Sequence, residues 1–317
     1  MSAQNYVNSA PKDDSKTVHS TTPERFQNVP AGIFSILVAM FIFSLCNVSV
    51  KLISGTYGTW QITFARFAFV LIPVFYLLKK DGLRVALKPK RIDLLAGTGI
   101  LGACAVFVLF KAFHLGNLAE VTALAYSSIL FLTALSVPIL KETVGWRRWC
   151  AVVVGFTGVI LMASPGTSFA TGSLLAIVFA LMDAGIMILL RLSTAHNRVS
   201  TTVFYMSLFA ALVSLPFMSF DFVMPTSLFD ISIFLFLGIG GGIGQIFMTR
   251  AYDLAPASAV SPMVYTSMLW GGLFGVTFFS ETITPNLISG AIVVVLCSLY
   301  IIYRENVERN TPHLDIT

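Results

Sequence analysis

One acidic side chain, Asp183, lies in the middle of an apolar stretch that runs over residues 172–191. If this stretch is a transmembrane helix, an unpaired charge at that depth costs about 2.5 to 3.5 kcal/mol on insertion scales. The carboxyl group is therefore expected to face a cavity, to meet a cation or to hold a proton. We assign Asp183 to coupling, because a carboxyl group can bind and release a proton as a carrier changes side. A protonated side chain that only hydrogen-bonds a neighbouring helix is the alternative.

Arg66 is a second lone charge, in the apolar stretch 59–78. Its guanidinium group can hold a carboxylate or a phosphate at two points, or pair with Asp183 while the site is empty. The alternative is a side chain that reaches outward to the membrane interface. Gln61 lies on a similar face of the same helix, one position off a full turn, and is a further candidate for substrate binding.

Hydroxyl groups occur in two matching clusters, at Tyr126 to Ser128 and at Tyr265 to Ser267. On symmetry-related helices they suit a central site that hydrogen-bonds a polar solute, while the tyrosine rings and Trp270 stack on a planar group. Tyr126, Ser128, Tyr265, Ser267 and Trp270 are therefore candidate substrate-binding residues. Hydrogen bonds between helices explain the hydroxyl groups equally well.

The two hydroxyl clusters belong to a longer duplication. Residues 111–143 align with residues 250–282 without a gap, at an offset of 139 (250 minus 111), and residues 32–52 align with residues 172–192 at an offset of 140. Two similar halves of opposite orientation can rock around one shared site in a membrane. The duplication therefore favours a transporter that works by alternating access.

Glycines follow the same duplication, with Gly99 on Gly238 and Gly102 on Gly241. Small residues at this spacing let helix backbones approach closely. We therefore expect the glycine-rich helices to pack tightly, and a bulky side chain at Gly241 to harm folding or transport. Gln245, just after this glycine run, is a candidate contact to the solute.

Composition places the chain in a bilayer. With 56% apolar residues, 11% charged residues and a mean hydropathy of +0.84, it has too few charges to cover a soluble protein of 317 residues. The net charge of +5 does not indicate nucleic-acid binding, because the basic residues form short clusters between apolar runs. Nothing in the sequence resembles a metal cluster or an ATP-binding motif, so neither a metal nor a cofactor is predicted.

Apolar windows of about 20 residues, the length that crosses a bilayer core, occur ten times. We expect an all-α integral membrane protein with ten transmembrane helices, arranged as two inverted five-helix repeats. The expected domains are a disordered tail 1–30, a first repeat 31–164, a second repeat 172–303 and a C-terminal tail 304–317. The expected spans are 31–53, 59–78, 93–113, 118–140, 147–164, 172–191, 201–219, 231–250, 257–280 and 286–303.

Basic residues predict the orientation of the spans. The loops after spans 2, 4 and 6 contain Lys or Arg, whereas the loops on the opposite side contain none, so both termini are expected in the cytoplasm. Lys51 and Arg191, at equivalent helix ends, are expected to reach their membrane interfaces rather than the solute. Glu142 and Glu281 end the fourth helix of each repeat, and we expect them to accept hydrogen bonds from the start of the next helix, with gating as the alternative.

Several short motifs are similar to those of one transporter family. They are Lys141-Glu142 before Trp146 to Trp149, Gly155 to Val159, Asn47 to Lys51, Phe64 to Arg66 and Leu181 to Asp183. The chain resembles the EamA branch of the drug/metabolite transporter superfamily over about 33–162 and 174–303, and is nearest in look to its S-adenosylmethionine and riboflavin uptake carriers. The resemblance implies secondary transport of small metabolites and adds Asn47 to the candidate substrate-binding residues.

The leading hypothesis is a secondary active transporter, not an enzyme, in the cytoplasmic (inner) membrane. Its cargo is a small polar or zwitterionic metabolite that is amino-acid-like, S-adenosylmethionine-like or vitamin-like. The alternatives are an exporter of the same fold, a channel and a membrane-embedded enzyme. The expected partners are a small-molecule solute and the lipid bilayer but no nucleic acid, and a second copy of the chain, in a homodimer, is a further candidate.

Overall fold

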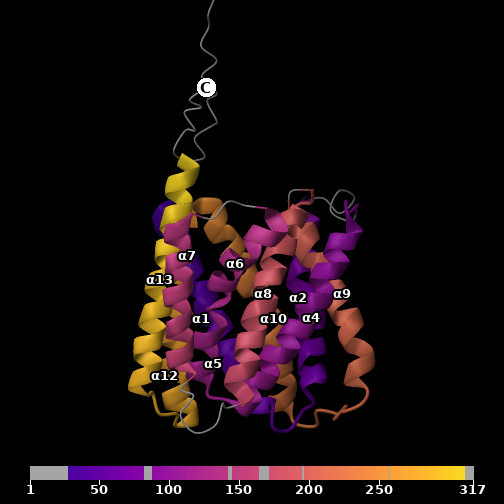
Figure 1. The fold of residues 1–317 in the computed structure, drawn as a ribbon. Helices are drawn as coiled ribbons and strands as arrows, with labels where there is room; N and C mark the ends of the chain where they lie inside the picture. The colour runs from indigo at the N-terminus through magenta and orange to yellow at the C-terminus, as the bar shows by residue number, and fades with distance from the viewer. Residues whose placement is uncertain are drawn as a thin grey trace, which may run out of the picture.

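The computed structural model describes residues 28–81, 88–141, 145–163, 171–194, 196–255 and 257–310. All regular secondary structure in these ranges is helical (Figure 1). The helices are α1 (Val29–Ile53), α2 (Thr59–Asp81), α4 (Ile92–Leu115), α5 (Leu118–Ala125), α6 (Ser128–Leu140), α7 (Trp146–Met162), α8 (Thr171–Thr194), α9 (Val199–Met218), α10 (Leu228–Leu254), α11 (Ala257–Val264), α12 (Thr266–Phe279) and α13 (Pro285–Asn310).

Eight segments of the described chain are long and apolar enough to cross a membrane. Helices α5 and α6 together form one of them, Leu118–Leu140. The predicted spans 147–164 and 257–280 correspond to α7, which has 17 residues, and to α11 with α12, which have 8 and 14 residues. The chain is thus a multi-pass membrane protein that is all-helical over the described ranges; α7 is shorter than the eight long segments, and the second of these two predicted spans is divided into two short helices.

The ends of the first and last helices differ slightly from the prediction. Helix α1 begins at Val29, where the side chain of Asn28 accepts a hydrogen bond from Ala31 N at 3.2 Å and a proline occupies the first turn. Helix α13 continues to Asn310, so part of the expected C-terminal tail is helical. The expected N-terminal tail lies almost entirely outside the described residues.

The fourth helix of each repeat is interrupted, the first between α5 and α6 and the second between α11 and α12. At each break a hydroxyl group donates a hydrogen bond to the carbonyl oxygen three residues earlier. Ser127 Oγ donates to Leu124 O and Thr266 Oγ1 donates to Met263 O, both at 2.7 Å. Such side-chain bonds compete with the helical ladder, so the structure differs from the two continuous helices that the apolar pattern predicted.

The helices of the two repeats interlock (Figure 1). The most extensive helix pairings each join a helix of the first repeat to one of the second: α1 with α10, α4 with α8, α7 with α13 and α2 with α9. The pairings also follow the duplication, because the contact of α2 with α10 has its counterpart in the contact of α9 with α4. The repeats are therefore units of sequence whose helices alternate in space, not two bundles side by side.

Glycines mark two places where the backbones of the repeats touch. A Cβ atom added to Gly158 of α7 would lie 2.8 Å from Gly290 O of α13. A Cβ atom added to Gly172, at the start of α8, would lie 2.6 Å from Gly116 Cα, just after α4. Because any side chain would force these helices apart, glycine is required for both approaches.

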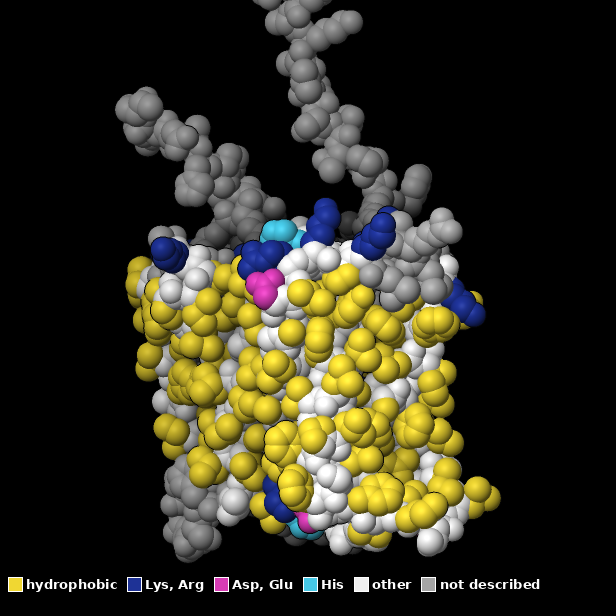
Figure 2. Space-filling model, turned by 90° about the vertical axis from the view of Figure 1, so that its right-hand side faces the viewer, with side chains coloured by type: hydrophobic (Ala, Val, Ile, Leu, Met, Phe, Trp, Pro, Cys, Tyr) yellow, Lys and Arg dark blue, Asp and Glu magenta, His cyan; other side chains and the backbone are white. Residues whose placement is uncertain are grey.

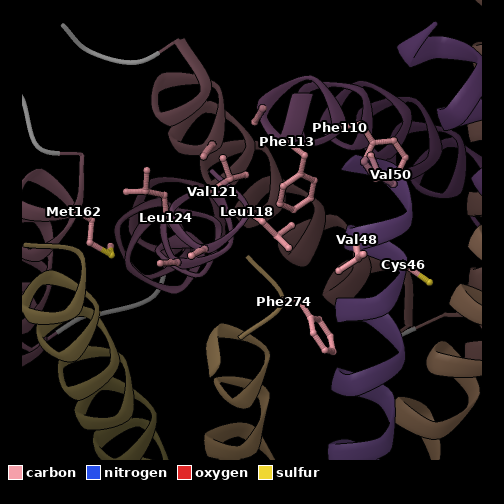
Figure 3. Close-up of a cluster of buried hydrophobic side chains, with 14 of the residues drawn as sticks. Cys46, Val48, Val50, Phe110, Phe113, Leu118, Val121, Leu124, Met162 and Phe274 are labelled. Carbon is pink, nitrogen blue, oxygen red and sulfur yellow. The ribbon is translucent and has the colours of Figure 1, made fainter. Parts of the chain in front are cut away.

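The largest buried apolar cluster lies where α1, α4 and α5 meet the end of α12 (Figure 3). Phe113 of α4 and Leu118 and Val121 of α5 are almost completely buried, and Phe274 of α12 reaches them from the second repeat. Lipid tails are as apolar as these side chains, so close packing rather than transfer out of water stabilises the cluster in a membrane.

The outer surface has the pattern expected of a bilayer protein. Figure 2 shows hydrophobic side chains over most of the visible face, with Lys and Arg gathered mainly at the upper edge, the edge from which α13 extends in Figure 1. Large apolar side chains such as Phe34, Tyr76 and Leu269 are strongly exposed, which is stable only against lipid.

Candidate functional site

A cavity of about 400 Å³ lies between the helices of the two repeats. Its volume falls in the range of small-molecule sites. Most of its wall is apolar, contributed chiefly by α1, α4 and α8. Six of the ten predicted site residues line it: Asn47, Arg66, Tyr126, Ser128, Asp183 and Gln245.

Arg66, in the third turn of α2, reaches this cavity with its guanidinium group against α10. A Cβ atom added to Gly241 would lie 2.6 Å from Arg66 Nη2 and closer still to Cζ and Nη1. Gly241 therefore makes room for a guanidinium group, whereas the sequence predicted only close packing of helices. The thiol group of Cys46 is next to the same guanidinium group. No described carboxylate lies within 4.0 Å of Arg66.

Asp183 reaches the cavity from the middle of α8. The Ser128 hydroxyl group, at the first residue of α6, interacts with its carboxyl group. The break between α5 and α6 brings Tyr126 and Ser128 to the cavity wall. No Lys or Arg in the described ranges lies within 4.0 Å of Asp183, so the ion pair with Arg66, one of the options that the sequence left open, is not seen.

Gln61 does not line this cavity. Its amide nitrogen donates to Val223 O at 2.7 Å and its amide oxygen accepts from Val223 N at 3.0 Å. The side chain is 5% exposed and ties the start of α2 to the segment between α9 and α10. Because Gln61 is on nearly the same face of α2 as Arg66, the sequence suggested that both contact the solute. In the structure both polar atoms of the Gln61 amide instead bond to the backbone of Val223.

The second hydroxyl cluster also lies outside the cavity. Ser267 Oγ shares a hydrogen bond with Ser44 Oγ of α1 at 3.0 Å, and Trp270 stacks on Phe274 with ring centroids 5.9 Å apart. Tyr265 is buried behind Tyr126, with ring centroids 5.7 Å apart. The structure thus places these three predicted contacts in helix packing; Tyr265 and Ser267 both lie next to Tyr126, which lines the cavity.

Lys51 and Glu281 form an ion pair that the sequence did not lead us to expect. Glu281 also accepts hydrogen bonds from Leu118 N at 2.7 Å and Ala119 N at 3.2 Å, and Lys51 Nζ donates to Gly116 O at 2.8 Å. The glutamate therefore caps the start of α5 in the other repeat rather than the helix that follows it. The lysine is paired within the protein instead of reaching the interface. The sequence could have indicated this ion pair, because Lys51 and Glu281 have opposite charges and were both predicted at the same face of the membrane.

The structure gives no sign of a metal centre in the ranges it describes, where no group of three or more His, Cys, Asp or Glu side chains converges. The cavity instead offers one guanidinium group, one carboxyl group, hydroxyl groups and amides on an apolar wall. This donor set suits the recognition of a small polar solute.

A duplicated set of apolar helices around a cavity that contains a few polar and charged side chains is the arrangement of a membrane transporter. The family model described as "EamA-like transporter family" matches residues 30–164 and again residues 170–304. The chain belongs to this family. The two matches cover both repeats, and the family comprises membrane transporters rather than enzymes.

Relatives with assigned roles extend over nearly the whole chain. The pseudopaline exporter CntI of Pseudomonas aeruginosa is 27% identical over 271 residues, 85% of this chain and 95% of that protein. An S-adenosylmethionine uptake transporter of Rickettsia prowazekii is 26% identical over 290 residues, 89% of this chain and 96% of that protein. A solved crystal structure with 16% identity matches 89% of this chain and 98% of its own with a TM-score of 0.59, which supports the fold alone.

Proposed function

We propose that this protein is a secondary active transporter that moves a small polar or zwitterionic metabolite across the cytoplasmic membrane by alternating access. The observation that carries the proposal is the presence of two separate charges in one cavity, Arg66 on α2 and Asp183 on α8. Each charge is costly at membrane depth, and neither is neutralised by the other. A solute or a coupling proton supplies the missing partner.

Arg66 is the residue proposed to hold an anionic group of the cargo. The N–H donors of its guanidinium group suit two-point binding of a carboxylate. The contact with Gly241 holds this group at the cavity wall. Asn47, Gln245 and Tyr126 add neutral hydrogen-bonding groups around the same space. Amino-acid-like, S-adenosylmethionine-like and vitamin-like metabolites all present such mixed polar groups.

Asp183 is the residue proposed to couple transport to a proton gradient. The carboxyl group can exchange a proton with whichever side the cavity faces, and Ser128 provides a hydrogen-bonding partner. The proposal includes ten passes in two inverted repeats, with α7 and the pair α11–α12 completing the eight long spans. The Lys and Arg side chains at the upper edge in Figure 2 support cytoplasmic termini.

Export is the second candidate function for the same site. The similarity to a pseudopaline exporter favours it, just as the similarity to S-adenosylmethionine uptake transporters favours uptake. Both directions use the same cavity and the same two charges, so they differ in the gradient that drives the cycle and not in the chemistry of binding.

The test is a flux assay on purified protein in proteoliposomes. Amino acids, S-adenosylmethionine, riboflavin and organic acids are screened with and without a pH gradient. We expect saturable flux and counterflow for one class of solute, and a strongly raised KM for that flux in Arg66→Met. Arg250→Met, which makes the same change outside the cavity, is the matched control. Flux that rises linearly with concentration and shows no counterflow would indicate a channel and refute the proposal.

A further inference from the structure

Two glycines at equivalent positions of the repeats, Gly102 and Gly241, have different surroundings. One turn earlier the repeats agree. A Cβ atom added to Gly99 would lie 2.8 Å from a backbone oxygen of α9, and one added to Gly238 would lie 3.0 Å from a backbone oxygen of α2. Helix α4 therefore crosses α9 as α10 crosses α2. One turn further along, at Gly102 and Gly241, the two repeats no longer have equivalent contacts.

In α10 the guanidinium group of Arg66 covers the glycine, whereas no atom lies within 4 Å of a Cβ atom added to Gly102 of α4. The sequence explains the difference. Phe69 and Phe209 contact the equivalent glycines at the two crossings, and their offset of 140 (209 minus 69) sets Met206 opposite Arg66. The second repeat has no guanidinium group to fill the space. We call this open part of the cavity, over Gly102, the Gly102 seat.

Asp183 is within about one helical turn of the Gly102 seat, on the neighbouring helix α8. Helices α4 and α8 run antiparallel, and a Cβ atom added to Gly185 would lie 3.2 Å from Leu101 Cδ2. Together with the contact of Gly172 with Gly116, this places position 102 within about one turn of position 183 across the pair. Both residues line the central cavity. The first repeat thus supplies a cation, Arg66, without a carboxylate, and the second supplies a carboxylate, Asp183, near the open space over Gly102.

We propose that the Gly102 seat binds a compact organic cation of the cargo, such as an ammonium or guanidinium group, which pairs with Asp183. The cargo cation lies over Gly102 as the guanidinium group of Arg66 lies over the equivalent glycine, Gly241. The inference rests on the proposed transport function and narrows its substrate class. The cargo carries a positive group at one end and an acceptor for Arg66 at the other. In a cavity of low dielectric constant, the Asp183 carboxylate attracts such a cation strongly.

The experiment uses Gly102→Cys as a reporter in the full-length protein, because a side chain at this position meets no neighbour. Three methanethiosulfonate reagents are compared: the cationic ethyltrimethylammonium, the neutral hydroxyethyl and the anionic ethylsulfonate compound. Mass spectrometry measures the rate of modification of the introduced thiol, peptide by peptide. The neutral reagent corrects for access to the cavity, so that the ratio of cationic to neutral rates reports local charge.

We expect the cationic reagent to react at position 102 about tenfold faster than the neutral one. The ratio should fall to about one when Asp183→Asn is added. Adding Met206→Arg should block all three reagents, because a second guanidinium group then fills the seat. Native Cys46, beside Arg66, is the internal control and should not prefer the cation.

Three results would overturn the inference: equal rates for all reagents, a cation preference that survives Asp183→Asn, or a preference of the same size at Cys46. The last would place charge selection at the cavity entrance. The rate of thiol modification can be measured whether or not the protein transports a solute. Charge selection at position 102 without any saturable flux would refute the proposed function alone, whereas flux of a cationic solute by Met206→Arg at the normal rate would refute this inference alone.

Discussion

Gly241→Ala should disable the transporter without unfolding it. The added methyl group would lie 2.6 Å from Arg66 Nη2 and nearer still to Cζ. Since non-bonded atoms prefer about 3.5 Å, the guanidinium group must move by about 1 Å. The displaced atoms belong to the end of a flexible side chain, so the helices need not separate. Alanine in place of glycine within a helix also stabilises it by about 0.5 to 1 kcal/mol.

The expected loss is in the binding of an anionic or zwitterionic solute. A hydrogen bond to a charged group contributes about 1.5 to 3 kcal/mol, and losing it raises the apparent KM by roughly 10- to 150-fold. The measurement is the KM for the solute that the flux screen identifies, together with the temperature at which the detergent-solubilised protein unfolds. Gly241→Ala should raise KM and leave the unfolding temperature unchanged or higher.

Gly238→Ala is the matched control one turn away. There an added Cβ atom would lie 3.0 Å from Ala65 O and overlap with Phe69 Cβ, so overpacking should cost about 1 to 3 kcal/mol and lower the unfolding temperature. A double variant of Gly241→Ala with Arg66→Met should have the KM of Arg66→Met alone, because no guanidinium group remains to be displaced. A normal KM in Gly241→Ala, or additive losses in the double variant, would refute the reasoning.

Three further outcomes follow from the contacts described. Asp183→Asn should abolish uptake driven by a pH gradient and leave part of the counterflow; gradient-driven uptake at the normal rate in this variant would remove Asp183 from coupling. Glu281→Met should lower the free energy of unfolding by about 3 to 5 kcal/mol, because it strands Lys51, and adding Lys51→Met should restore part of it; an additive loss on thermal unfolding would contradict this. Gln61→Met should cost about 1 to 3 kcal/mol for each backbone group of Val223 left unpaired, with an unchanged KM for solute; a raised KM would return Gln61 to the binding site.

Much of the helical architecture could be predicted because length and apolarity are local properties. The apolar windows locate the spans, and the repeat offset identifies which helices are equivalent. The breaks at Ser127 and Thr266 could not be read from apolarity, since a single hydroxyl group that turns back to a carbonyl leaves the hydropathy of the segment almost unchanged. Interlocking of the repeats was also hidden, because an offset between two stretches says nothing about which helices they contact.

The sequence predicted the charged residues of the candidate site, because a charge inside a membrane span is energetically costly. It did not predict which neutral polar residues belong to the site. Arg66 and Asp183 stand out because a charge inside a span needs a reason. Gln61 and Ser267 carry neutral polar groups, which a loop backbone or another hydroxyl group satisfies equally well, so their types did not distinguish packing from binding. The role of Gly241 emerged only when a side chain from α2 was seen to rest on it.

The interlocking of the two repeats has a consequence for how the chain is made. None of the extensive pairings among the described helices is complete until the second repeat has entered the bilayer. At about 5 to 20 residues per second, α1 waits roughly ten seconds or more for α10. During this interval Lys51, at the end of α1, has no Glu281 to meet. The newly made first half must therefore survive in the lipid on the strength of its individual helices, and truncation after residue 164 should leave a product that quality-control proteases remove.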